Sequence, residues 1–237
     1  MKEYILVSMF FVLLAVPACK SPDSAGVDNS KPKETAADTS DPNAKAEFLK
    51  TARKFTELPF VTAKVDRVMT YDGKDVTYSR QIEFAAPNRT RIKPLDDNGD
   101  QLEYIAMGKT VYVGTCSRCP GGIKWDKLSE DGGPVDVMAP FRAESLRRLS
   151  DVKFDGEETI DGKKTSVYSY QNQVFMGLID KVDFMTVSSC KVWVRQDKGV
   201  PVKLHADFSN SPVKSLDIVF DVEKSVKIEA PVVSAPK

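Results

Sequence analysis

The sequence has few of the residues and motifs on which most enzymes and metal proteins depend. His205 is its single histidine, and there are only four cysteines. It contains no G-x-S-x-G nucleophile motif, no H-E-x-x-H zinc motif and no phosphate-binding loop. The acidic pair Glu157-Glu158 lies in hydrophilic turn sequence, without the apolar surroundings that tune a catalytic carboxyl. We therefore expect a protein that is not an enzyme, that uses no metal or other cofactor, and in which His205 is structural.

An excess of one charge is also missing, because 34 Lys and Arg residues balance 34 Asp and Glu residues. A chain without net positive charge has no long-range field that attracts nucleic acid, so we expect no nucleic-acid partner. The apolar run over residues 4–16 is too short to cross a bilayer comfortably. Its length does suit the apolar region of a secretory signal.

That run ends in the residues Val16-Pro17-Ala18-Cys19, which resemble a bacterial lipobox. In this motif the signal peptidase cuts before the cysteine, whose sulfur carries a diacylglycerol. We expect residues 1–18 to be a lipoprotein signal peptide and Cys19 to anchor the chain to a membrane. An ordinary cleaved signal and a retained anchor helix are the alternatives. The resemblance implies a lipid-anchored protein of the cell envelope, and Lys20 favours the periplasmic face of the outer membrane if the cell has two membranes.

Composition divides the rest of the chain into a tether, one domain and a tail. Residues 20–41 contain no aromatic residue and one large aliphatic residue, so they cannot bury enough apolar surface to fold. We expect residues 19–43 to form a lipidated, disordered tether. Residues 44–229 are long enough for a single domain with its own core. The Pro-punctuated residues 230–237 are expected to be a loose tail.

Hydrophobic spacing within the domain predicts one clear helix and many strands. Asp41 is a suitable N-cap, Pro42 suits the first turn, and apolar residues three or four apart continue to Leu58-Pro59. A second helix is expected over 139–149, whereas the apolar segment between 173 and 189 has no clean period. The pattern predicts an α+β fold, with a curved antiparallel sheet of about ten strands that carries two or three helices on one face. The expected strands cover 61–71, 76–84, 89–95, 101–107, 110–114, 152–160, 165–171, 190–196, 201–208 and 215–229.

Several of these segments resemble one protein family. The sequences IEFAAPNRTRIKP, LEYIAMGKTVYV and IKWDKL, followed by GEETIDGKKTSVYSY and KVWVRQDKGVPVKLHADF, are similar to the strand and turn motifs of the LolA/LppX-like lipoprotein superfamily. The resemblance covers residues 60 to 229. It implies a strongly bent, half-open β-barrel whose apolar concave side is covered by helices. The superfamily includes periplasmic lipoprotein carriers, glycolipid-binding lipoproteins and sensor subunits of envelope stress systems.

A bent sheet with an apolar inner face leaves a cavity that suits an acyl chain. We expect this concave cavity to bind a lipid or the acyl chain of a lipoprotein, for holding, sensing or transfer. The alternative is a regulatory module whose cavity is filled by its own side chains and whose loops bind an envelope protein. The residues expected to line the cavity are Val65, Met69, Tyr78, Ile82, Phe84, Leu204, Ile218 and Phe220.

The segment TCSRCPGG places Cys116 and Cys119 three positions apart before a proline and two glycines. In an oxidising envelope, a disulfide that closes this small loop is the simplest interpretation. A thioredoxin-like redox pair is disfavoured because the proline and glycines do not begin a helix. A zinc site would need Cys190 and His205 as further ligands. Pairing of Cys190 with either cysteine, or a free buried Cys190 thiol, stays open.

Overall fold

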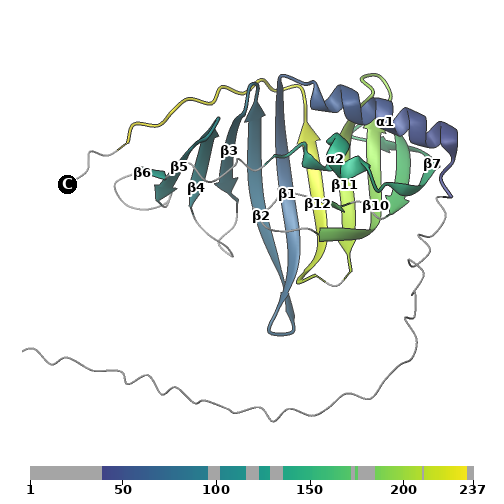
Figure 1. Ribbon diagram of the computed structural model, residues 1–237, viewed down its shortest axis with the longest axis horizontal. Helices are drawn as coiled ribbons and strands as arrows, with labels where there is room; N and C mark the ends of the chain where they lie inside the picture. Colours follow the sequence, from purple (N-terminus) through teal and green to yellow (C-terminus); the bar gives the residue numbers. More distant parts are fainter. Residues whose placement is uncertain are drawn as a thin grey trace, which may run out of the picture. The chain divides into compact units, whose positions relative to one another are not determined.

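One large antiparallel sheet forms the framework of this computed structural model (Figure 1). The structure describes residues 39–95, 102–115, 123–128, 136–171, 174–175, 185–209 and 211–233. In sequence order its elements are α1 (Pro42–Thr56), β1 (Phe60–Tyr71), β2 (Lys74–Ala85), β3 (Arg89–Pro94), β4 (Glu103–Met107), β5 (Thr110–Thr115), β6 (Lys124–Leu128), the 3₁₀ turn η1 (Ala139–Phe141), α2 (Ala143–Leu146), β7 (Ser150–Ile160), β8 (Lys163–Gln171), β9 (Val174–Phe175), β10 (Met185–Arg195), β11 (Val200–Phe208) and β12 (Val213–Asp221).

The strand order shows how the sheet is built. Eleven strands follow one another as β6-β5-β4-β3-β2-β1-β12-β11-β10-β8-β7, and β9 pairs with β10. Most neighbouring strands follow one another in the sequence and form hairpins. By contrast β1, the first strand, pairs with β12, the last. The order does not close, because β6 and β7 lie at its two ends. The predicted α+β fold, a curved half-open sheet with helices on its concave side, is confirmed.

Helix α1 forms where the sequence predicts it. The Asp41 carboxylate accepts hydrogen bonds from the backbone N–H groups of Asn43 and Ala44, at 2.9 and 3.4 Å. These bonds satisfy N–H groups that the first helical turn leaves unpaired. The segment before the helix is fixed to β7, since the Val152 N–H donates to Ser40 Oγ and the Val152 carbonyl accepts from the Asp41 N–H, both at 2.9 Å. The buried face of α1 consists of Ala44, Phe48, Thr51, Ala52 and Phe55.

Helix α1 packs on the concave face of the sheet, where it contacts β7, β11 and η1 (Figure 1). Its Phe55 ring makes edge-to-face contacts with Phe141 of η1 and Phe220 of β12, with ring centroids 4.9 and 5.0 Å apart. Phe48 lies 5.0 Å from Tyr170 of β8 by the same measure. Aromatic pairs at these separations add to the stabilisation from burial. The chain's own aromatic rings therefore fill the space between α1 and the strands beneath it.

Two predicted elements are shorter than the spacing suggests. The stretch 139–149 is the turn η1 and the single-turn helix α2, separated by Arg142 in extended conformation. Asp136 fixes this break, because its carboxylate accepts from the Met138 N–H at 2.9 Å and from Arg142 Nε at 2.8 Å. The last strand ends at Asp221 and not at 229. There the Asp221 carboxylate accepts from the Glu223 N–H at 2.8 Å and turns the chain away from the sheet.

The segment after β12 covers part of the convex face, which is the face opposite α1. Ile228 is buried there in a small cluster with Ile105 and Trp125, and its carbonyl accepts from Arg89 at 3.2 Å. Gly114 makes room for this cluster, because a Cβ at that position would lie 3.0 Å from the Trp125 ring. The residues on the convex face near β4–β6 therefore form a second hydrophobic cluster, separate from the main core.

Arg195 joins the β10–β11 turn to the segment after β12. Its buried guanidinium donates to Asp197 at 2.8 and 2.5 Å and to Glu223 at 2.5 Å. These bonds hold the pKa of both carboxyls at about 2, below the ordinary values of Asp and Glu, and Lys198 adds to the effect at Glu223. Carboxyls with a lowered pKa stabilise the fold above their unfolded pKa, and that stabilisation is lost as the pH falls through the folded pKa.

We expect Arg195→Gln to make the melting temperature less sensitive to acid between about pH 4.5 and pH 2. The measurement is thermal unfolding across this range for both proteins. Lys50→Gln is the control, since it removes a cation whose pair with Glu47 is well exposed. Parallel curves for the wild type and Arg195→Gln would show that Arg195 does not cause the lowered pKa values.

Candidate functional site

The eight residues predicted to line a cavity lie on one face of four neighbouring strands, β2, β1, β12 and β11. Val65 pairs with Ile218, and Ile218 pairs with Leu204. Antiparallel partners project to the same side of a sheet, and alternate residues of a strand share a face. The structure thus brings together on the concave face all of Val65, Met69, Tyr78, Ile82, Phe84, Leu204, Ile218 and Phe220.

Helices cover the late-strand members of this set. Leu204 and Ile218 have no exposed surface, and Phe220 is 5% exposed. The Phe220 ring contacts Phe55 and Phe141, with centroids 5.0 and 5.8 Å apart. In this half of the concave face the side chains of α1 and η1 occupy the space above the strands.

Two early-strand members of the set, Met69 and Tyr78, lie at a polar end of the concave face. Met69 and Tyr78 are partly exposed, and the Arg67 guanidinium lies 5.5 Å from the centre of the Tyr78 ring. Arg80 shares this face, since it pairs with Val65 on one side and Pro94 on the other. Arg80 is also the residue that interrupts the apolar alternation of β2 in the sequence. Two guanidinium groups therefore lie beside the apolar rows near the β1–β2 hairpin.

A helix-free apolar surface continues from β2 to β6. Figure 1 shows the labelled helices over the β12-to-β7 half of the sheet and none over β3–β6. One row of cross-strand partners runs Ile82–Ile92–Tyr104–Val113, and a second runs Phe84–Thr90–Ala106–Val111–Leu128. Tyr104, Val111 and Val113 are partly exposed, and Leu128 is 43% exposed. The other members of the two rows are buried, namely Ile82, Phe84, Thr90, Ile92 and Ala106. We call the four accessible residues, Tyr104, Val111, Val113 and Leu128, the open concave surface.

The part of the concave face beyond β2 was not predicted from the sequence. The reason is that β4 is apolar on both faces: Tyr104 and Ala106 face the concave side, whereas Ile105 and Met107 contribute to the cluster on the convex side. Alternation therefore does not distinguish the two faces of β4. The available signal is the register, because Ile92 pairs with Ile82, a residue that was predicted to line the cavity.

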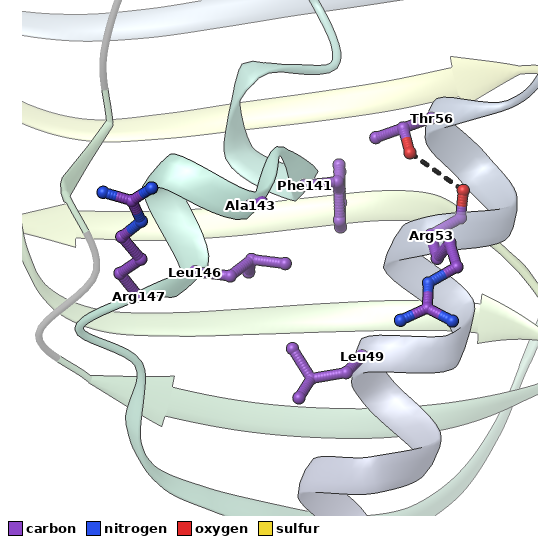
Figure 2. A pocket seen from close by; sticks show the side chains of 7 residues that line it. All are labelled: Leu49, Arg53, Thr56, Phe141, Ala143, Leu146 and Arg147. Carbon is purple, nitrogen blue, oxygen red and sulfur yellow. Dashed lines mark hydrogen bonds between the residues drawn. The ribbon is translucent and has the colours of Figure 1, made fainter.

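A groove of about 310 Å³ lies between α1 and the η1–α2 segment (Figure 2). Its apolar side chains are those of Leu49, Phe141, Ala143 and Leu146. Arg53 of α1 lies on one side and Arg147, at the end of α2, on the other. None of the residues that line it is acidic. The Thr56 hydroxyl donates to the Arg53 carbonyl at 2.8 Å, in the last turn of α1. This groove was not predicted from the sequence.

His205 lies on the convex face, away from both surfaces. Its Nδ1 is 3.0 Å from Asp217, and its Nε2 is 3.3 Å from Asp207. Among the described residues, no group of three or more His, Cys, Asp or Glu side chains could hold a metal ion. The arrangement ties β11 to β12, as expected for a structural histidine.

The described cysteine, Cys190, is a free buried thiol that pairs in register with Tyr170. Burial raises the pKa of Cys190 well above its ordinary value, so the reactive thiolate is disfavoured. Cys19, Cys116 and Cys119 lie outside the described residues, so the predicted lipidation and the predicted Cys116–Cys119 disulfide stay predictions.

No protein-family model matches the sequence, and no curated protein matches it. The structure is similar to the crystal structure of the Mycobacterium tuberculosis lipoprotein LppX, with 17% identity, a TM-score of 0.57 and coverage of 80% of this chain and 100% of that one. It is also similar to LprF from Mycobacterium bovis, with 12% identity, a TM-score of 0.56 and coverage of 81% and 98%. At these identities the likeness shows the fold, and it confirms the LolA/LppX-like fold predicted from the sequence motifs.

Proposed function

We propose that this chain, which has the fold of the lipoprotein LppX, binds a lipid or the acyl chain of a lipoprotein on its concave face. The observation that carries the proposal is the open concave surface, the accessible β4–β6 end of two largely apolar rows, over which no described helix lies. Apolar side chains that are accessible to water and lie side by side are a candidate binding surface. No covalent chemistry is needed, since each methylene transferred from water contributes about 0.8 kcal/mol.

The proposal includes a membrane anchor on Cys19, from which the chain holds its ligand near the bilayer. Residues 20–41 separate Cys19 from α1, and even fully extended they span at most about 75 Å. A protein on such a tether acts locally, as a holder, a sensor or a donor to a nearby partner. In the described part of the chain no helix is long and apolar enough to cross a membrane.

A second candidate function follows from the covered half of the sheet. There Phe48, Phe55, Phe141 and Phe220 fill the concave face themselves. A self-filled sheet of this kind suits an interaction module that presents its surface to an envelope protein. The two candidates differ in whether the open concave surface takes up lipid.

Lipid uptake from vesicles tests the proposal directly. The chain from Asp38 onward is the suitable protein, because Asp38–Lys237 forms one compact unit that keeps Ser40 and Asp41 bonded to β7. After incubation with vesicles of phosphatidylcholine labelled on its acyl chain, gel filtration should show the label eluting with the protein. In the full chain, Cys19→Ala should move the protein from the membrane fraction to the soluble fraction.

Two results would contradict the proposal. Protein that elutes without label would favour the interaction module over the lipid-binding function. Unchanged membrane attachment of Cys19→Ala would show that the anchor does not depend on Cys19.

A further inference from the structure

We infer that the groove between α1 and the η1–α2 segment binds an anionic lipid, with part of its acyl chain between Leu49 and Leu146 and its phosphate on one of the two arginines that flank the groove, Arg53 on one side or Arg147 on the other. This inference rests on the proposed lipid-binding function and specifies the headgroup that the protein selects. It concerns a site on the helices, distinct from the open concave surface on the strands.

The apolar part of the groove provides the contact surface for the acyl chain of the lipid. Leu49 is 38% exposed and Leu146 is partly buried, so both present aliphatic surface to solvent (Figure 2). Phe141 is only 2% exposed and is held by Phe55 and Phe220, so the groove ends on a rigid aromatic ring. A volume of about 310 Å³ is at the lower end of small-molecule sites, enough for part of a chain.

The charged side chains of the groove are of one sign. Within the described residues, neither Arg53 nor Arg147 forms a hydrogen bond or an ion pair through its guanidinium. By contrast Lys50, one turn before Arg53, pairs with Glu47 at 3.6 Å, and Arg142 pairs with Asp136 at 2.8 Å. The two arginines that flank apolar surface are thus available to an incoming anion.

Arginine is well suited to a phosphate ligand. Its planar guanidinium donates two parallel hydrogen bonds to phosphate oxygens, and it loses less hydration than an ammonium group does. A zwitterionic headgroup carries its own cation, which offsets this attraction. The groove should therefore prefer an anionic headgroup over a zwitterionic one when the acyl chain is the same.

The test compares two single-chain probes with the same fluorescent acyl chain, lysophosphatidylglycerol and lysophosphatidylcholine, both below their micelle concentrations. The double variant Arg53→Gln/Arg147→Gln should lose at least about tenfold in affinity for the anionic probe and little for the zwitterionic one. Lys54→Gln/Arg148→Gln is the matched control. It removes the same charge from the next positions along the chain, Lys54 in α1 and Arg148 in the turn after α2, which do not line the groove.

Two further experiments separate the contribution of the acyl chain from that of the headgroup. Leu49→Asp should weaken the binding of both probes, because it places a carboxylate against the acyl chain. Inorganic phosphate should not displace the anionic probe at equal concentration, since it lacks the chain.

Three outcomes would overturn the inference. The first is an unchanged preference for the anionic probe in the groove variant. The second is an equal loss in the control pair, which would mean that net charge alone attracts the probe. The third is a loss that appears in Arg80→Gln instead, which would place the headgroup on the concave face. In each case lipid uptake from vesicles can persist, so the groove assignment can fail while the proposed function stands.

Discussion

Replacing Phe55 by alanine should lower the free energy of unfolding by about 3–5 kcal/mol. The Phe55 side chain has no exposed surface and is held between the rings of Phe141 and Phe220. Its removal leaves a cavity at the centre of the contact between α1, η1 and β12, and it also abolishes two edge-to-face ring contacts. Urea denaturation of the Asp38–Lys237 chain measures the change.

Leu49→Ala is the matched control on the same helix. Leu49 is 38% exposed and lies outside the aromatic cluster, so its truncation should cost less than about 1 kcal/mol. If Phe55→Ala were no more destabilising than Leu49→Ala, α1 would not be fixed to the sheet by its aromatic residues. The covered half of the concave face would then be able to open.

Replacing Val113 by aspartate should weaken lipid binding by more than about tenfold, the largest functional effect that we expect. Val113 lies in the middle of β5 at the end of the row Ile82–Ile92–Tyr104. A carboxylate there would lose its hydration against an acyl chain, or would keep its water and exclude the chain. Titration with a fluorescent fatty acid measures the change in affinity.

Val219→Asp makes the same substitution on the convex face. Val219 is 50% exposed and pairs in register with Lys64 and Lys203, so a carboxylate there has basic neighbours and no role in the proposed site. We expect wild-type affinity and wild-type stability from this variant. Equal losses in Val113→Asp and Val219→Asp would mean that the open concave surface does not hold the ligand.

Local sequence patterns predict an element correctly where the burial of one apolar face decides its structure. The cap at Asp41 and the spacing from Ala44 to Phe55 predict α1, and the alternation of Leu216, Ile218 and Phe220 predicts β12. In both elements one face is apolar and the other is mostly polar, so periodicity identifies the buried side. The family motifs then supplied the topology that local patterns do not contain.

Other features depend on contacts between distant segments. The stretch 139–149 has helical spacing, but Asp136 and the burial of Phe141 divide it into η1 and α2. Strand β4 is apolar on both sides because the segment around Ile228 returns to cover its convex face. The groove needs Arg53 and Arg147, which flank the same groove only after α1 and the η1–α2 segment have docked.

Native mass spectrometry tests most directly whether this fold carries a lipid. The Asp38–Lys237 chain would be secreted to the bacterial periplasm, purified without detergent and measured before and after denaturation. We expect a stoichiometric lipid that is released on denaturation and is absent from Val113→Asp. A ligand-free mass that stays unchanged after incubation with phospholipid would contradict the lipid-binding function and support the interaction module.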